Sequence, residues 1–201
     1  MPEQQTSRRS FIRTSIAGAV GATLMVQGTA LARLPRRRED VLKLGVASYS
    51  LREFPRGEAI EMIQALRTPY VNIKSFHLPY ELTAAELAEG RAEFERAGLE
   101  VVGGGTVTFD EDTDEGVKRY FDYARGAGMP LIVATSAPSV LPRIERFAKE
   151  YDILVAIHNH GPEDRHYPSP YDALRHIENM DPRMGLCVDI GHTVRAGTDV
   201  V

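Results

Sequence analysis

Short apolar runs rich in β-branched residues alternate along the chain with longer segments of mixed apolar and polar character. The apolar runs begin near Leu42, Tyr70, Leu99, Pro130, Ile153 and Gly185. Helix-like segments lie between them, at residues 57–67, 83–97, 112–126, 139–150 and 170–179. The pair of strand and helix recurs about every 22 to 32 residues, which is typical of βα units that build a parallel sheet.

Local signals mark the ends of one of these helices clearly. Thr83 and Glu86 have the spacing of a capping box, in which the hydroxyl and the carboxylate satisfy backbone N–H groups of the first turn. Gly98 follows Ala97 at the other end, and glycine is a common helix terminator. The spacing therefore predicts a helix over 83–97.

Two architectures contain repeated βα units: an open doubly wound sheet and a closed (β/α)8 barrel. The turn after the first apolar run, at residues 48–59, contains no G-x-G-x-x-G sequence, which disfavours a dinucleotide-binding sheet. We therefore expect an α/β fold of the (β/α)8 TIM-barrel type with about six βα units. Because a closed barrel has eight, the pattern predicts either a C-terminally truncated domain or a barrel that another chain completes, and we favour truncation.

The N-terminal residues have the pattern of an export signal. Arg8 and Arg9 precede a small, apolar stretch at 16–26, and Ala30-Leu31-Ala32 supplies an A-x-A cleavage site. We expect a twin-arginine signal peptide at 1–32, a linker at 33–40 and the barrel domain at 41–201. The protein would then use the twin-arginine export machinery and function in the periplasm or cell envelope. Retention of the segment as an uncleaved anchor stays open.

Composition limits the partners. Lys and Arg number 24 against 28 Asp and Glu, and the formal net charge is −4. Since affinity for nucleic acid comes mainly from basic residues that contact phosphates, we expect no nucleic-acid partner. Cys187 is the sole cysteine of the sequence, so the fold has no internal disulfide and depends on packing.

Metal-ligating residue types lie at the ends of the last two apolar runs. His158 and His160 are two residues apart, so on a strand they project to the same side. Asp189 and His192 follow the next run. Carboxyl ends of parallel strands meet at one edge, and imidazole with carboxylate suits a divalent cation. We expect His158, His160 and Asp189 to bind a metal. The alternative is that the histidines are hydrogen-bonded structural residues and that Asp189 caps a helix.

The chain resembles the xylose-isomerase-like sugar phosphate isomerase and epimerase barrels, a superfamily that also contains endonuclease IV-type DNA repair enzymes. The resemblance extends over nearly the whole region after the signal. It rests on five segments: Leu44–Ser50, Lys74–Pro79, His158–Asp164, Tyr167–Asp172 and Cys187–Gly197. The last contains a D-x-x-H sequence followed by Ala-Gly and is the most specific.

The resemblance implies roles for particular residues. Asp189 would ligate the metal, and His192 would be a catalytic residue that faces the substrate or a second metal. Most relatives have a glutamate, both ligand and proton-transfer base, where this chain has His158. Imidazole can also ligate a metal or accept a proton, so we expect His158 to be catalytic. Glu163 could supply the missing carboxylate, or it could be an exposed turn residue.

Residues of the first two βα units complete the expected site. Lys74 shares a strand face with Asn72, so it either points inward as a catalytic residue or reaches solvent at the strand end. We expect Tyr49 and His77 to contact the substrate together with His192. The glycine run at 103–105 would shape the pocket by allowing close backbone approach.

These residues and the resemblance predict a metal-dependent sugar or sugar phosphate isomerase or epimerase that removes a proton next to a carbonyl and forms an enediolate. The cation would be manganese, with zinc, magnesium or cobalt as alternatives, and the partner a small-molecule sugar, with homo-oligomers open. Three other functions remain: a lyase or hydrolase of oxidised sugar glycosides, a non-catalytic sugar-binding protein, and a DNA repair endonuclease.

Overall fold

The computed structural model describes residues 42–200, which form a six-stranded parallel sheet with helices between the strands. Strand order follows the sequence from β1 to β6, so each βα unit adds its strand beside the previous one. This is the α/β arrangement that the sequence pattern predicts. The expected signal peptide at 1–32 and linker at 33–40 lie outside the described residues. Within residues 42–200, no helix combines the length and the apolar character that crossing a membrane requires.

Five of the strands have three to six residues and β3 has ten, and the register shifts once in each of the β2–β3 and β3–β4 pairings. The strand bounds are Gly45–Ala47 (β1), Tyr70–Ile73 (β2), Glu100–Phe109 (β3), Leu131–Ser136 (β4), Leu154–His158 (β5) and Met184–Cys187 (β6). All five pairings are parallel, and the β5–β6 register sets His158 opposite Cys187. Within the described residues β1 pairs with β2 alone and β6 with β5 alone, so the sheet is not closed.

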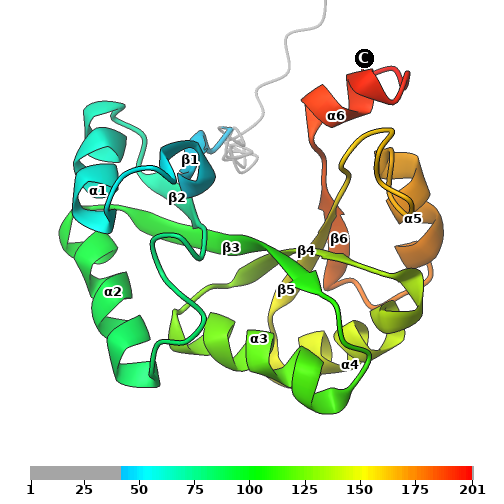
Figure 1. Ribbon diagram of the computed structural model, residues 1–201, viewed down its shortest axis with the longest axis horizontal. Coiled ribbons are helices and arrows are strands. Elements are labelled where there is room, and N and C mark those ends of the chain that lie inside the picture. The colour runs from blue at the N-terminus through cyan, green and yellow to red at the C-terminus, as the bar shows by residue number, and fades with distance from the viewer. Residues whose placement is uncertain (1–41, 201) are drawn as a thin grey trace, which may run out of the picture. The chain divides into compact units, whose positions relative to one another are not determined.

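The helices follow one another along one side of the sheet (Figure 1). Their bounds are Arg56–Ala65 (α1), Ala84–Arg96 (α2), Asp114–Gly126 (α3), Leu141–Tyr151 (α4), Pro170–Ile177 (α5) and Ile190–Arg195 (α6), and two 3-10 turns lie at Ser48–Leu51 (η1) and Pro138–Val140 (η2). The capping box expected at the start of α2 is present: the Thr83 hydroxyl accepts the backbone N–H of Glu86, and the Glu86 carboxylate accepts that of Thr83.

The hydrophobic core lies between the sheet and these helices. Phe121 of α3 is fully buried, and its ring lies 6.0 Å from that of Phe109 in β3 and 5.9 Å from that of Phe147 in α4, measured between centroids. Val155 and Ile157 of β5 are also buried on this side. Burial of such side chains contributes roughly 1.5–3 kcal/mol each, so the packed outer face holds the strands in place.

The first strand is shorter than the apolar run around it. It ends at Ala47 because the Ser48 hydroxyl, and not a strand carbonyl, accepts the backbone N–H of Lys74, at 2.8 Å. The chain then turns through η1. The third strand is longer than expected, since it continues through the glycine run to Phe109. The short helix α6 also lies beyond the expected helices.

Gly105 shows why the glycine run belongs to the sheet. A Cβ atom at this position would lie 2.2 Å from the carbonyl oxygen of Val133 in β4, and its φ of +115° is one that side chains other than glycine rarely adopt. The glycine therefore permits close approach of β3 and β4. The expected role of the glycine run in shaping a pocket stays a prediction.

Replacement of Thr83 by alanine tests the capping box. The Glu86 N–H then has no side-chain acceptor, so the free energy of unfolding should fall by about 1 kcal/mol, measured by urea denaturation followed by circular dichroism. Thr83→Ser keeps the hydroxyl and serves as the control. Equal stability of the alanine and serine variants would contradict the assignment.

Candidate functional site

The ends of β5 and β6 are joined by the amide of Asn159. This side chain is 1% exposed and accepts the backbone N–H of Asp189 at 2.9 Å. It also donates to the Asp189 carbonyl at 3.2 Å and to the Thr193 hydroxyl at 3.1 Å. Because all three contacts are buried or partly buried, they fix the position of Asp189 relative to the end of β5.

Three potential metal ligands meet at this edge of the sheet. His158, Asp189 and His192 each offer one ligand atom, and these atoms lie within 4.8 Å of one another. His158 comes from the last residue of β5, and Asp189 and His192 from the start of α6. Two imidazoles and one carboxylate form a donor set that suits zinc or manganese. The expected group differs in one member, since His192 takes the place assigned to His160.

His158 has an imidazole nitrogen that is free for a ligand. Its Nδ1 atom is buried, and no hydrogen-bond partner for it is present among the described residues. Burial of the ring and the neighbouring His160 and His192 lower the pKa of His158, against the opposing effects of Asp189 and of a hydrogen bond with the Cys187 backbone. The ring is therefore neutral at pH 7 and keeps a lone pair, as metal ligation or proton acceptance requires.

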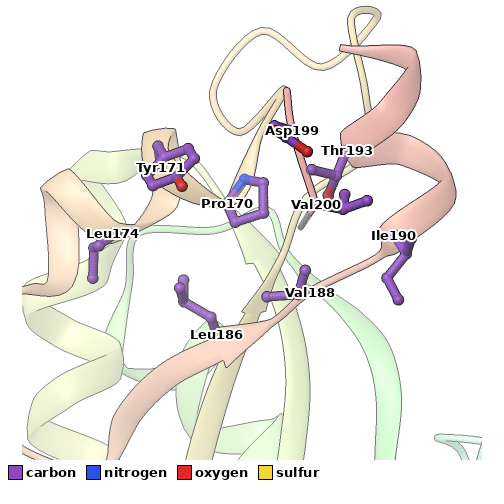
Figure 2. A pocket seen from close by; sticks show the side chains of 9 residues that line it. All are labelled: Pro170, Tyr171, Leu174, Leu186, Val188, Ile190, Thr193, Asp199 and Val200. Carbon is purple, nitrogen blue, oxygen red and sulfur yellow. The ribbon is translucent and has the colours of Figure 1, made fainter. Parts of the chain in front are cut away.

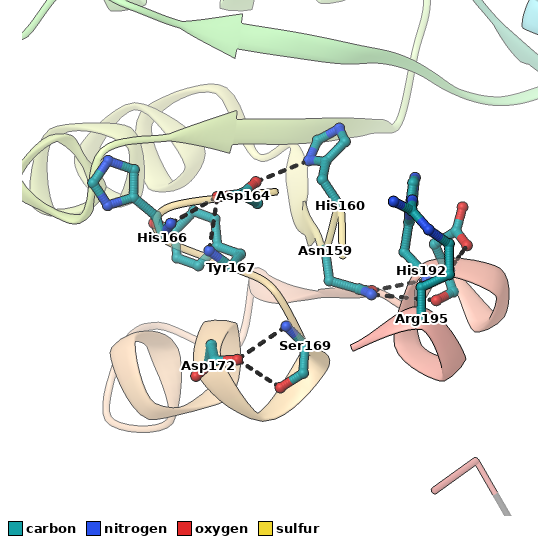
Figure 3. A network of polar contacts seen from close by, with 10 residues as sticks. Asn159, His160, Asp164, His166, Tyr167, Ser169, Asp172, His192 and Arg195 are labelled. Carbon is teal, nitrogen blue, oxygen red and sulfur yellow. Dashed lines mark hydrogen bonds and ion pairs between the residues drawn. The ribbon is translucent and has the colours of Figure 1, made fainter. Parts of the chain in front are cut away.

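His160 lies beside the group, next to a carboxylate. Its ring centroid is 4.4 Å from that of His158 and 5.8 Å from that of His192. Its Nδ1 atom lies 3.2 Å from Oδ2 of Asp164 (Figure 3). A carboxylate can only accept, so Nδ1 of His160 carries the proton, and Nε2 is the atom left to accept one when the ring is neutral.

Asp164 holds the loop after β5 in shape. Its Oδ1 atom accepts the backbone N–H groups of His166 at 2.7 Å and Tyr167 at 2.9 Å. Burial acts to raise the pKa of this carboxyl, but the N–H groups of Tyr167 and His166 and the nearby His160 outweigh it, so the pKa lies below its ordinary value. The carboxylate thus both orients His160 and ties the loop together.

Asp189 has a second role as the N-cap of α6. Its Oδ1 atom accepts the backbone N–H of His192 at 2.8 Å. The helix-capping alternative considered from the sequence is therefore observed. A cap uses one carboxylate oxygen, which leaves the other for a cation, so the two roles are compatible.

Glu163 lies outside the group of three and forms an ion pair. The guanidinium of Arg195 donates to Oε1 of Glu163, and the side chain of Glu163 is 66% exposed. Of the two roles considered for Glu163, the structure therefore favours the exposed loop residue over the replacement for the missing carboxylate ligand. The same guanidinium contacts the ring of His192, with 3.0 Å between Nη1 and Nδ1.

Lys74 directly follows β2, and both Lys74 and Asn72 contact the backbone of β3. Nζ of Lys74 donates to the carbonyl of Thr106 at 2.6 Å, and Asn72 donates to the carbonyl of Gly105 at 3.0 Å. Burial lowers the pKa of Lys74 below its ordinary value. Strands β3 and β4 separate it from the histidine group in the sheet order.

The other two expected substrate contacts lie near the first βα loop. Tyr49 is 50% exposed, and its ring stacks under Arg52, 4.6 Å from the guanidinium carbon. His77, in contrast, is buried: Nδ1 lies 3.0 Å from the Ser48 hydroxyl, and Nε2 lies 3.2 and 3.1 Å from the carbonyls of Leu51 and Phe54. Both ring nitrogens of His77 are thus occupied within the fold, so the structure indicates a loop-stabilising residue where we expected a substrate contact.

A separate apolar hollow of about 510 Å³ lies beside β6 (Figure 2). It is bordered by α5, β6, α6 and the residues that follow α6, and its lining is Pro170, Tyr171, Leu174, Leu186, Val188, Ile190, Thr193, Asp199 and Val200. None of the three clustered ligands lines it. The hollow therefore offers apolar surface at the open edge of the sheet and not the polar groups of the candidate site.

Sequence reasoning missed three contributors: Asn159, Asp164 and Arg195. Asp164 is four residues after His160, and Arg195 is three after His192. Spacing of i+3 is informative on a helix, so Arg195 could have been found had α6 been predicted. Asn159 gave no such signal, because the strand alternation places it on the face that packs against helices.

Comparison with known proteins supports the fold assignment. No protein-family model and no curated protein matches the chain. An uncharacterised protein from Parabacteroides distasonis has a similar structure, with a TM-score of 0.66 and 28% identity over 78% of this chain and 67% of its own. A D-psicose 3-epimerase matches with a TM-score of 0.62 and 16% identity, over 76% of this chain and 65% of its own. The 3-keto-D-glucoside 4-epimerase of E. coli matches with a TM-score of 0.59 and 14% identity, over 76% and 70%.

The matched structures include xylose-isomerase-like TIM-barrel sugar epimerases and isomerases, so the predicted resemblance is confirmed in the fold. The chain spans about two thirds of the length of the structures that it matches.

Asp164→Asn tests the loop network through its pH dependence. Because the folded pKa of Asp164 is lowered, its stabilisation is present above the unfolded pKa of about 3.9 and is lost as pH falls through the folded pKa. We expect the variant to lose about 1–2 kcal/mol of unfolding free energy at pH 7. The difference from wild type should shrink towards about pH 2, measured by urea denaturation across pH. As a control, Asp110→Asn on the exposed surface should change stability at pH 7 by less than about 0.5 kcal/mol. A pH-independent difference for Asp164→Asn would contradict the assignment.

Proposed function

We propose that this chain, whose fold is that of the xylose-isomerase-like TIM-barrel sugar epimerases and isomerases, has metal-dependent sugar or sugar phosphate isomerase or epimerase activity. The observation that carries the proposal is the convergence of His158, Asp189 and His192 to within 4.8 Å at the carboxyl ends of β5 and β6. In parallel α/β folds this edge of the sheet is where active sites are built.

A divalent cation fits these residues. The buried Nδ1 atom of His158 has no other partner in the described residues, and a buried polar atom without a partner is costly unless it has a ligand. His158 and Asp189 would hold the cation, while His192 completes the group either as a third ligand or as a contact to the sugar. Manganese is the proposed ion, with zinc, magnesium or cobalt as alternatives. When bound, the cation would polarise a sugar carbonyl and stabilise the negative charge that develops on its oxygen.

Proton transfer falls to His160, which lies in the loop after β5. Its ring is oriented through Nδ1 by Asp164. Its Nε2 atom is therefore the proton acceptor on that ring. Removal of a proton from the carbon next to the carbonyl gives the enediolate. Return of the proton to the same carbon from the opposite face gives epimerisation, and return to the neighbouring carbon gives isomerisation.

Lys74 and Tyr49 would bind the far side of the sugar. Lys74 is partly desolvated and already donates to the Thr106 carbonyl, so its remaining N–H groups can donate to hydroxyl or phosphate oxygens. The half-exposed ring of Tyr49 offers an apolar face for the sugar ring. In this proposal both residues contribute binding and orientation, and the chemistry stays at β5 and β6.

A second activity, on oxidised sugar glycosides, draws support from one comparison. One structure of this fold is named a 3-keto-D-glucoside 4-epimerase, and loss of a proton beside a keto group also begins β-elimination. We propose that the protein acts in the periplasm or cell envelope, because residues 1–32 have the pattern of a twin-arginine signal. The small-molecule substrate would then be an extracytoplasmic sugar.

Solvent deuterium exchange tests the activity. Manganese-loaded protein is incubated with candidate ketoses, aldoses and 3-keto glycosides in deuterated water, and the products are identified by NMR and mass spectrometry. We expect deuterium at a carbon adjacent to the carbonyl in at least one sugar. The rate should fall by about 10²-fold or more in His158→Gln. Absence of exchange in every sugar, or cleavage of abasic DNA instead, would count against the proposal.

Metal binding is tested independently of turnover. Titration with Zn²⁺ or Mn²⁺, followed by calorimetry, should show weaker binding by at least about 10-fold in His158→Gln. His176→Gln replaces an exposed histidine of α5 and is the matched control, with wild-type affinity expected. Equal affinities of the two variants, or no bound metal in the wild type, would favour a sugar-binding protein without metal chemistry.

A further inference from the structure

Arg195 lies between an acidic side chain and a ring of the candidate site. It comes from the last residue of α6, and its guanidinium donates to Glu163 in the loop after β5 and contacts Nδ1 of His192 at 3.0 Å. Figure 3 shows Arg195 directly beside His192. Since Glu163 is 32 residues away along the chain, the contact joins two different βα units at the rim of the site.

The chemistry of a guanidinium fixes the state of the imidazole. Arginine has five N–H donors, no acceptor, and a pKa too high for it to lose its proton. Its contact with Nδ1 of His192 is therefore a hydrogen bond only if Nδ1 carries a lone pair. An N–H on Nδ1 would set two donors against each other across the 3.0 Å contact. The neutral ring then holds its proton on Nε2, the nitrogen that Arg195 does not contact.

This arrangement is the reverse of what a metal-ligating histidine needs. A histidine that binds a metal through one nitrogen usually donates the N–H of the other to a carboxylate, a carbonyl or water. Here a carboxylate is present, Glu163, but Arg195 lies between it and the ring. Nε2 of His192 therefore offers a proton instead of a lone pair, and ligation through Nδ1 would have to displace the guanidinium.

Gly161 makes the room for this contact. It has a φ of +87°, and a Cβ atom on it would lie 3.1 Å from Nδ1 of His192 and 3.4 Å from both Nη1 of Arg195 and Oε2 of Glu163. Contacts as short as 3.1 Å are tighter than side chains normally make, so a larger residue would push the three groups apart. The loop conformation and the ion pair thus depend on each other.

We infer that Arg195, held by Glu163, is a positioning residue that keeps His192 in its Nε2–H form, so that His192 donates a hydrogen bond to the sugar oxygen and is not a third metal ligand. The second half rests on the proposed function; the state of the ring does not. The cation is then left with His158 and Asp189 from the group of three. A donor fixed beside the cation adds a second stabilising contact to the oxygen that gains charge.

The state of the ring can be measured directly. Long-range ¹H–¹⁵N NMR on histidine-labelled protein distinguishes the two neutral forms, and His192→Gln assigns the signal. We expect His192 as the Nε2–H form in wild type. Arg195→Met, which removes the donor and keeps the bulk, should lose this preference, and Arg195→Lys, which restores an N–H donor, should recover it. An Nδ1–H ring in wild type, or an unchanged ring in Arg195→Met, would overturn the inference.

Addition of Zn²⁺ tests the ligand question on the same sample. The ¹⁵N signals of His158 should shift on saturation, while His192 keeps its Nε2 proton. In calorimetric titrations His192→Gln should retain Zn²⁺ affinity within about threefold, whereas Asp189→Asn should lose at least about 10-fold. Loss of the Nε2 proton on metal addition, or a larger affinity loss in His192→Gln, would show that His192 is a ligand and overturn the assignment.

These readouts separate the two proposals, because neither needs turnover. If no sugar exchanges deuterium but the Nε2–H form and the affinity pattern are found, the proposed function fails and the Arg195 arrangement stands. If exchange occurs and the ring is in the opposite form, the arrangement fails alone.

Discussion

The buried amide of Asn159 is the contact on which the candidate site depends. Parallel strands hold each other only as far as their ladders extend, and the β5–β6 ladder ends at His158 and Cys187. Beyond that point the side chain of Asn159 connects the two segments, because it accepts the backbone N–H of Asp189 and donates to the Asp189 carbonyl. An amide has both a donor and an acceptor, so it can continue the pairing where the backbone diverges. The carboxylate of Asp189 is thereby held near the imidazole of His158.

Around this amide, a polar neighbour assigns the tautomer of two of the three imidazoles. Asp164 accepts from Nδ1 of His160, and Arg195 donates to Nδ1 of His192, while Nδ1 of His158 has no partner in the described residues. In the proposed function these three rings would serve three tasks: His160 would accept a proton, His192 would donate a hydrogen bond and His158 would ligate the metal. The polar neighbours would then matter as much as the histidines themselves.

His77 and Lys74 show how well residue type predicts which side chains belong to the candidate site. Both come from one short segment, and both were expected near the sugar. Lys74 directly follows the last residue of β2, and its Nζ donates to the Thr106 carbonyl of the neighbouring strand β3. His77 follows the strand, where alternation no longer applies, and its ring turns to Ser48 and the carbonyls of the first loop. Strand alternation therefore gives no direction for a residue four positions beyond the end of β2.

The sequence by itself determined the parallel α/β architecture, the capping box at Thr83, and the arrival of His158 and Asp189 at the same edge of the sheet. These features follow from short-range periodicity and from the rule that parallel strands end together. Only the tertiary structure decided that His192 lies beside His158 and Asp189. It also decided that Glu163 forms an ion pair with Arg195, and that the Asp164 carboxylate accepts from His160. The physical reason is that such contacts depend on loop paths and side-chain rotamers across separate βα units, where no sequence period specifies which polar atoms meet.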